Sequence, residues 1–309
     1  MPLLPRPSDP RIDVVACTFR RPGLLARLID ALAAQRLDAL RLNLIVVDND
    51  PLQSARTVCA GAALRHAGLA LRYVSVPQQN IALARNAGLA ACSAELIAFI
   101  DDDEQPCADW LQNLYRAARD YQAELVFGPV LPDYHPATPA WLIAGGFFER
   151  PRHPSGSAMP LPEARTGNVL MSAALIQRCA LRFDPALGLS GGEDSEFFRQ
   201  LYLTQCKAVW CDEAIVSEAV PPERACERWL LRRSFRIGSV ESCQARGRGA
   251  HSGLARICLK IVYLWARTLL ELVPASLCSR AHRLRVWRRG AIGAGLIYGL
   301  LFGVFNEYQ

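Results

Sequence analysis

The first hundred residues alternate short apolar runs with segments in which apolar residues recur at helical spacing. Short apolar runs are typical of buried strands, and a strand–helix repeat predicts a parallel, doubly wound sheet with helices on both faces. The fold class predicted from the sequence is therefore α/β. The predicted strands are 12–17, 42–47, 71–76 and 96–100, and the predicted helices between them are 24–32, 54–66 and 81–91.

Four consecutive acids, Asp101-Asp102-Asp103-Glu104, follow the fourth predicted strand. Open α/β sheets bind ligands at the carboxyl ends of their strands. Adjacent carboxylates repel one another unless a cation lies among them, and Mg²⁺ or Mn²⁺ prefers oxygen ligands of this kind. The cluster therefore indicates a divalent metal site. The alternative is a solvated acidic turn before a helix that starts near Ala108, because acids favour helix N-termini.

Charge is distributed unevenly along the 309 residues. Residues 223–290 contain 15 Lys or Arg and 4 Asp or Glu, a formal charge of +11, whereas the rest of the chain carries −5. Such asymmetry indicates contact with a polyanion, either nucleic acid or an anionic membrane face. We predict an α/β domain over 1–222 and a basic, apolar helical extension over 223–309 that associates with a membrane.

Cysteine usage and the N-terminus point to the cytoplasm. The eleven cysteines are scattered without CxxC or Cys/His metal spacing, which is typical of reduced, buried thiols. The proline-rich residues 1–10 lack the apolar core of a signal peptide. No GxGxxG follows the first strand and no GxxxxGK[ST] occurs, which argues against a dinucleotide-dependent dehydrogenase and a P-loop NTPase.

Five short motifs stand in a fixed order along the predicted domain. They are Cys17-Thr18-Phe19-Arg20-Arg21-Pro22, Val46-Val47-Asp48-Asn49, the segment 80–88 (NIALARNAG), Asp101-Asp102-Asp103 and Gly191-Gly192-Glu193-Asp194. This ordered set, over 14–198, resembles the signature of family 2 glycosyltransferases with the GT-A fold. The segment 220–233 is similar to the trailing segment of bacterial exopolysaccharide enzymes of the succinoglycan-biosynthesis type. The resemblance implies a Rossmann-like GT-A domain.

The resemblance implies a nucleotide-sugar donor, UDP-linked, and places residues around it. Asp48 matches the acid that accepts a hydrogen bond from the uracil ring, Thr18 would lie under the nucleotide, and Arg85 matches the arginine that reaches the base. Asp102 would face the ribose or the sheet. The alternatives are an Asx-turn for Asp48 and an exposed helical arginine for Arg85.

In the same family, Asp101 and Asp103 match the acids that hold a divalent metal, Mg²⁺ or Mn²⁺, on the diphosphate. The metal would neutralise the charge that develops on the leaving group. Many relatives offer a third ligand, often histidine, after the last strand. Here that segment reads Val216-Ser217-Glu218-Ala219, so Glu218 is the substitute oxygen ligand, or the site uses only the two aspartates and water.

The resemblance also assigns the general base. Asp194 matches the acid that removes the proton from the acceptor hydroxyl, which implies single displacement with inversion. The preceding glycines permit close approach of the backbone. The alternative for Asp194 is a helix N-cap. The implied reaction is transfer of a hexose to a glycan or lipid-linked acceptor in cell-surface polysaccharide synthesis.

The segment 129–162 is too long for a simple connection, so we predict a binding loop there. Its aromatic residues would stack on sugar rings or serve in packing. The segment Thr166-Gly167-Asn168-Val169-Leu170 resembles the one that borders the donor sugar. The aromatic residues of the predicted loop are Trp141, Phe147 and Phe148.

Three helical segments follow residue 222. A basic helix is predicted over 225–240, and an amphipathic helix that lies on a membrane over 256–273. The apolar segment 291–305 falls short of the ~20 residues that a spanning helix needs, so it is predicted as an interfacial or re-entrant anchor preceded by arginines. The alternative is a helical hairpin packed on the catalytic domain or on a second subunit. The predicted location is the cytoplasmic face of the cell membrane.

Two other classes compete with this assignment. A nucleic-acid-binding protein would account for the basic region, but arginines interleaved with Leu, Ile and Trp are more typical of a membrane face, and no helix-turn-helix or zinc signature occurs. A metal-dependent nucleotidyltransferase would use the acids. It needs a glycine- and lysine-rich loop after the first strand, where this chain has Thr18-Phe19-Arg20-Arg21-Pro22. We therefore predict no nucleic-acid partner.

Overall fold

The computed structural model describes residues 10–247, 251–276 and 278–305. The prediction made on the first residues of the chain therefore lies outside the described part, apart from Pro10. The chain divides into two compact units, Met1–Pro132 with Arg150–Ala219, and Asp133–Glu149 with Val220–Gln309. The predicted division after residue 222 did not anticipate that 133–149 groups with the second unit.

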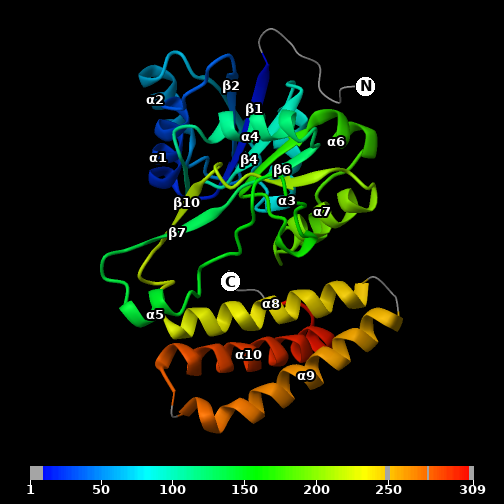
Figure 1. Ribbon diagram of the computed structural model, residues 1–309. Helices are drawn as coiled ribbons and strands as arrows, with labels where there is room; N and C mark the ends of the chain where they lie inside the picture. Colours follow the sequence, from blue (N-terminus) through cyan, green and yellow to red (C-terminus); the bar gives the residue numbers. More distant parts are fainter. Residues whose placement is uncertain (1–9, 248–250, 277, 306–309) are drawn as a thin grey trace. The chain divides into compact units, whose positions relative to one another are not determined.

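The first unit begins with the predicted alternation of strands and helices (Figure 1). Helix α1 starts at Pro22, whose fixed φ suits a first helical turn. Helix α3 starts after Asn80, whose side chain accepts a hydrogen bond from the backbone N–H of Leu83. The elements are β1 (Arg11–Thr18), α1 (Pro22–Ala33), β2 (Arg41–Asp48), α2 (Arg56–Arg65), β3 (Ala70–Ser75), α3 (Ile81–Ala91) and β4 (Leu96–Ile100).

The later elements complete the main sheet and add a small one. The seven-stranded sheet has the order β3-β2-β1-β4-β8-β6-β9, in which β8 runs antiparallel to both neighbours, and a three-stranded sheet has the order β5-β10-β7. The mostly parallel α/β class is confirmed. The elements are β5 (Glu104–Pro106), α4 (Trp110–Asp120), β6 (Leu125–Phe127), β7 (Val130–Tyr134), α5 (Ala140–Ala144), β8 (Asn168–Ser172), α6 (Ala173–Cys179), α7 (Glu193–Leu203), β9 (Ala208–Trp210) and β10 (Val216–Val220), with 3₁₀ turns at Leu161–Glu163 and Pro185–Leu187.

Alternate residues of each central strand enter opposite cores. In β1, Val14 packs with the apolar faces of α1, α2 and α4, whereas Val15 packs with α3, α6 and α7. Because successive side chains of a strand point to opposite faces, the sheet is covered by helices on both sides. All five residues of β4 are buried, as its uninterrupted apolar sequence predicts. The carboxyl ends of β1, β2 and β4 therefore meet at one edge.

The second unit contains three long helices that lie side by side, α8 (Glu227–Gly247), α9 (His251–Ser276) and α10 (Arg280–Phe302) (Figure 1). Glycines allow α8 and α10 to approach closely. A Cβ atom at Gly238 would overlap the backbone of Ile292, and one at Gly295 would overlap the backbone of Phe235. The three predicted helical segments are therefore confirmed, with bounds that differ at their ends.

The apolar segment predicted as a membrane anchor forms the second half of α10. Its Gly293 lies against Trp265 of α9, and Gly299 lies against Ser239 and Ser242 of α8. Leu296 is fully buried. These contacts correspond to a packed helix, and none of the helices in the described ranges combines the length and apolar character needed to cross a bilayer.

The aromatic residues of the predicted binding loop serve in packing within the second unit. Phe148 stacks on Trp229 with ring centroids 5.7 Å apart, and Trp141 lies edge-on to Phe147. Phe147 is buried in the core that also contains Leu230 and Leu284. Of the two predictions for these aromatics, packing is therefore the one that the structure supports.

Candidate active site

The ends of β1 and β4 bring Thr18 and the acids 101–104 together. The hydroxyl of Thr18 donates a hydrogen bond of 2.7 Å to Asp102, and both residues are buried. Arg21, in the loop before α1, contacts one oxygen of Asp102 and one of Asp103 at 3.1 Å each. Arg21 was not among the predicted site residues, although it follows the end of β1 by only three positions and so lies at this edge.

Arg85 of α3 connects these acids to the Glu193-Asp194 motif. Its guanidinium is buried, forms an ion pair with Glu193 and lies 3.6 Å from Asp101. Glu193 and Asp194 open α7, so the ion pair brings a motif 108 positions along the chain to the acid cluster. The predicted residues Asp101, Arg85 and Asp194 are thus close together. Arg85 is not an exposed helical arginine.

The turn before α7 depends on two glycines. Gly191 and Gly192 have φ values of 84° and 91°, in the left-handed region that disfavours side chains. Gly192 is the N-cap of α7, so the alternative role of Asp194 as N-cap is wrong. Asp194 instead lies in the first turn, is partly exposed, and accepts a hydrogen bond from the backbone N–H of Ser195 at 2.6 Å.

The electrostatic state of the cluster shows an excess of negative charge. Desolvation raises the pKa of Asp101 to about 7 against the opposing charge of Arg85, and Asp103, Asp102 and Glu218 add to the rise. Solvent still reaches 48% of the Asp101 side chain. Burial raises the pKa of Asp102, and raises that of Glu104 well above its usual value. Burial is therefore the main cause of the raised pKa values, and the four acids outnumber the two neighbouring arginines, Arg21 and Arg85.

Glu193 and Arg85 each oppose the effect of burial on the pKa of the other. Burial raises the pKa of Glu193, which Arg85 opposes and Asp194 reinforces. Burial lowers the pKa of Arg85, but Glu193, Asp101 and Asp194 more than offset this, so the guanidinium stays charged. A buried cation held by three acids fixes their relative positions without cancelling their charge.

Asp48 lies at the end of β2, and its side chain is fully buried. Its two oxygens accept hydrogen bonds from the backbone of Asp50 and Ala55 and from the hydroxyl of Tyr73, at 2.9–3.0 Å. The bond from Asp50, two residues on, is an Asx-turn, the alternative considered for this acid. Asp48 therefore organises the loop after β2, and its contact with a base stays a prediction.

The residues around Asp101 are chemically suited to a divalent cation. Glu218 of β10 faces Glu104 across the small sheet and pairs with Arg150 at 3.0 Å. Gly167 lies so close to Glu104 and Asp101 that a Cβ atom there would crowd their oxygens. Carboxylates with surplus negative charge fit Mg²⁺ or Mn²⁺. Within residues 10–247, 251–276 and 278–305, no three such side chains already converge in the geometry of a metal site.

Asn168, in the segment expected to border the donor sugar, has a structural role. Its amide donates to the carbonyls of Pro129 and Ala214 and accepts from the Trp110 indole at 2.8 Å. These bonds fix β8 behind the acid cluster and hold Gly167 beside it.

Comparisons with known proteins find relatives in sequence and neighbours in structure. The sequence profile of the family "Glycosyl transferase family 2" matches residues 13–166. The chain is 37% identical over 297 residues to the succinoglycan biosynthesis protein ExoM of Rhizobium meliloti, covering 94% of this chain and 93% of that protein. The Glu193-Asp194 motif lies beyond the family match but within the length aligned with this relative.

Solved structures share the fold at low sequence identity. The mannosyltransferase PcManGT of Pyrobaculum calidifontis, in complex with GDP-Man and Mn²⁺, is similar with a TM-score of 0.64 and 18% identity over 95% of this chain and 88% of that chain. Residues 1 to 349 of S. aureus TarS, in complex with UDP-GlcNAc, are similar with a TM-score of 0.53 and 16% identity over 72% of this chain and 65% of that chain.

Proposed function

This chain belongs to the family 2 glycosyltransferases, and from that premise we propose that it transfers a hexose from a UDP-sugar to a hydroxyl group of a growing glycan, with inversion at the anomeric carbon. The relative with 37% identity is a succinoglycan biosynthesis protein, which supports a role in exopolysaccharide synthesis. A lipid-linked glycan is the acceptor class that we favour.

The observation that carries this proposal is the position of Arg85 between Asp101 and Glu193. It brings an acid cluster suited to a sugar diphosphate next to Asp194, which is partly exposed to solvent. A donor and an acceptor hydroxyl can then meet between carboxylates of different environment, which single displacement requires.

The acids and Arg85 have different roles in the proposed transfer. Asp194 takes the proton of the acceptor hydroxyl while that oxygen attacks the anomeric carbon and the nucleoside diphosphate leaves from the opposite side. Arg85 and Glu193 position Asp194 at the start of α7. A divalent cation held by Asp101 and Asp103 would neutralise charge on the leaving diphosphate.

The nucleotide would lie over the ends of β1 and β2. Thr18 and Asp102, which bond each other, form the floor of this region, and Asp48 holds the loop that follows β2. Since Glu193 and Asp101 already engage the Arg85 guanidinium, its contacts favour a positioning role over the predicted contact with the base.

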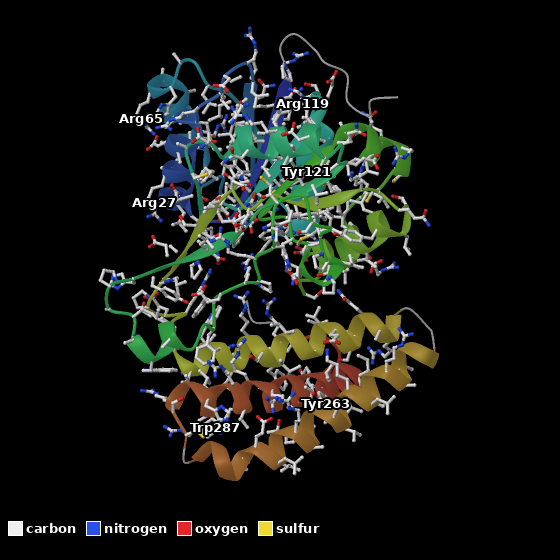
Figure 2. All side chains as sticks on the ribbon, viewed as in Figure 1. Arg27, Arg65, Arg119, Tyr121, Tyr263 and Trp287 are labelled. Carbon is white, nitrogen blue, oxygen red and sulfur yellow. The ribbon has the colours of Figure 1, made fainter. Side chains whose placement is uncertain are left out.

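We further propose peripheral contact with the cytoplasmic face of an anionic membrane. Helix α9 exposes apolar side chains at helical spacing, and Lys260 and Arg267 interleave with them. Figure 2 labels Tyr263 on this helix and Trp287 on α10, which are 56% and 52% exposed. The other large apolar residues exposed on α9 are Leu259, Val262, Trp265, Leu269, Leu270 and Leu272.

The decisive experiment is a donor screen with the full chain. UDP-glucose, UDP-galactose, UDP-GlcNAc and GDP-mannose are supplied with a membrane extract as acceptor source, and nucleoside diphosphate release is followed with Mn²⁺ or with EDTA. We expect release from one UDP-sugar, in Mn²⁺, that Asp194→Asn abolishes without weakening donor binding. Glu196→Gln, in the same helical turn, is the control. Release of inorganic diphosphate from UTP and a sugar phosphate would instead identify a nucleotidyltransferase.

A further inference from the structure

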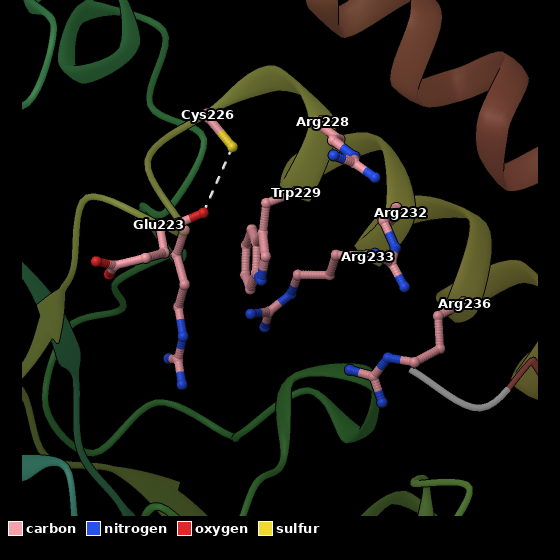
Figure 3. A pocket seen from close by; sticks show the side chains of 8 residues that line it. Glu223, Cys226, Arg228, Trp229, Arg232, Arg233 and Arg236 are labelled. Atoms are coloured by element: carbon pink, nitrogen blue, oxygen red, sulfur yellow. Dashed lines mark hydrogen bonds between the residues drawn. The ribbon is translucent and has the colours of Figure 1, made fainter. Parts of the chain in front are cut away.

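The second unit contains a pocket of about 580 Å³ that is lined mainly by arginines (Figure 3). Its walls come from the turn before α8 and the first turns of that helix. None of its residues belongs to the acid cluster of the first unit. The lining residues are Glu223, Arg224, Cys226, Arg228, Trp229, Arg232, Arg233 and Arg236.

Helical periodicity places three of these arginines in one row. Arg228, Arg232 and Arg236 are spaced by four residues, so their side chains follow one ridge of α8, while Leu230 and Ser234 are buried. Like charges at this spacing repel one another and destabilise a helix. An anion bound among the guanidinium groups would reverse that repulsion.

Trp229 fixes two further guanidinium groups. One face of its indole stacks on Phe148, and the guanidinium of Arg233 lies 5.0 Å and that of Arg224 5.9 Å from the ring centroid. Figure 3 shows Arg233 beside the Trp229 ring. Contact with an aromatic ring restricts the orientation of a guanidinium group.

The acids in the described parts of α8 and α9 pair outside the pocket. Glu227 pairs with Arg280 at 2.6 Å, Glu241 with Lys260 at 2.6 Å, and Glu271 with Arg267 and Arg289. Among the lining residues, five arginines face a single glutamate, Glu223. The lining therefore carries a strong positive charge in a recess of the size that holds small ligands.

We propose that this pocket binds the diphosphate group of an organic diphosphate, at a site separate from the donor site. The planar guanidinium fork matches phosphate oxygens in a bidentate manner, and several forks suit a group with two to three negative charges. A pocket of about 580 Å³ matches the volume of a small ligand, which favours a compact anion over a nucleic-acid backbone. The diphosphate is either carried by a lipid chain in a membrane or free in solution, and both sources present the same group.

The first test measures binding of inorganic diphosphate to the full chain by calorimetry, in EDTA so that the acid cluster has no metal. We expect Arg228→Gln/Arg232→Gln to weaken binding at least about tenfold. The control is Arg246→Gln/Arg256→Gln, which removes two exposed arginines of the same unit outside the pocket and should change the affinity less than about twofold. Equal loss in both pairs, or no binding by the wild type, overturns the proposal.

A second measurement separates this site from the donor site. Binding of UDP with Mn²⁺ should be unchanged in Arg228→Gln/Arg232→Gln, because the proposed donor residues lie in the first unit. A parallel loss of UDP and diphosphate binding would mean that the arginines belong to the donor site, which contradicts a separate pocket. Circular dichroism confirms that both double variants are folded.

A third measurement identifies the source of the diphosphate. Phosphatidylcholine vesicles with geranylgeranyl diphosphate test the lipid-borne form, and isopentenyl diphosphate in solution tests the soluble form. Stronger vesicle binding that the pocket variant loses assigns the lipid; stronger binding of isopentenyl diphosphate that it loses assigns the soluble compound. The proposal is wrong if the wild type binds neither diphosphate and instead binds duplex DNA in a salt-sensitive manner that the pocket variant loses.

Discussion

The two units concentrate opposite charge, and they do so by different structural means. In the first unit, acids from β4 and α7 meet because the sheet brings distant segments to one edge, and Arg21 and Arg85 are held among them. In the second unit, arginines gather because they recur along one helix. In the first unit the topology of the sheet therefore gives a network in which each charged group has several partners. In the second unit the helical repeat gives a row of arginines, each of which should contribute separately to binding an anion.

This difference predicts how each region responds to substitution. Residues of a network are coupled, so that removing one leaves others buried and unsatisfied, and effects are large and non-additive. Arginines on a ridge should give graded, nearly additive losses. The pocket variants above test the arginines, and the following predictions test the acid network and the packing of the second unit, in order of decreasing expected effect.

The largest effect is expected for Asp103→Ala. This change removes a predicted metal ligand and the partner of Arg21, so we expect metal-dependent donor binding to disappear and transfer to fall ~10³-fold. Titration of Mn²⁺-dependent UDP binding and steady-state transfer measure the two effects. Asp120→Ala, an exposed acid at the end of α4, is the control and should retain both. Full donor binding by Asp103→Ala would remove this acid from the site.

Arg85→Met tests the network itself. The change leaves Glu193 and Asp101 without the buried guanidinium, and breaking a buried ion pair costs ~3–5 kcal/mol. The double variant Arg85→Met/Glu193→Leu should recover part of that loss, because no unpaired carboxylate then remains at position 193. Urea unfolding of both single variants and the double variant measures the coupling. Additive losses would show that the two residues act independently, contrary to the network.

Gly295→Val tests whether the second unit can be destabilised without affecting the first unit. A side chain at this position would meet the backbone of Phe235, and overpacking costs ~1–3 kcal/mol. Hydrogen exchange should accelerate in α8 and α10 and stay unchanged in β1 and β4. Gly253→Ala is the control, since the nearest atom to its added Cβ lies 3.7 Å away. Uniform acceleration throughout the chain would argue against two units.

Much of the first unit could be predicted from its sequence because its strands are short and apolar and end in polar residues. The predicted strands and helices up to residue 100 correspond to observed elements. The antiparallel strand β8 between β4 and β6 was not predicted, since it pairs through contacts far apart in the chain. The link from Arg85 to Glu193 was missed for the same reason. The spacing of residues within one segment does not show which distant segment the fold brings into contact with it.

The second unit was less predictable. Helix α10 begins at Arg280, eleven residues before the predicted apolar segment, because Ser279 caps it by accepting a hydrogen bond from His282. Its first half resembles a charged linker, yet Leu284 and Val286 are buried there. The segment 133–149 joined this unit through aromatic contacts that no periodicity signals. The row of arginines was visible in the sequence, but the pocket depends on Trp229 and its stacking partner.

Glu104→Gln should have the smallest effect. It tests whether the negative charge of the acids 101–104 lowers the stability of the fold. Glu104 is fully buried, and desolvation together with Asp101 raises its pKa well above 4.5. Its oxygen accepts a hydrogen bond from the backbone N–H of Asp101, which a glutamine carbonyl can also accept.

The sign of the pH dependence follows from the raised pKa. Above about pH 4.5 the unfolded chain releases the Glu104 proton while the folded chain retains it, so wild-type stability falls as pH rises through the folded pKa. Glutamine removes this loss. In EDTA, thermal unfolding should therefore show Glu104→Gln gaining stability over the wild type toward pH 8 and the difference vanishing below pH 4.5. A wild type that is the more stable at pH 8 would mean that the charge of Arg150, which opposes the rise in the pKa of Glu104, already balances the neighbouring acids.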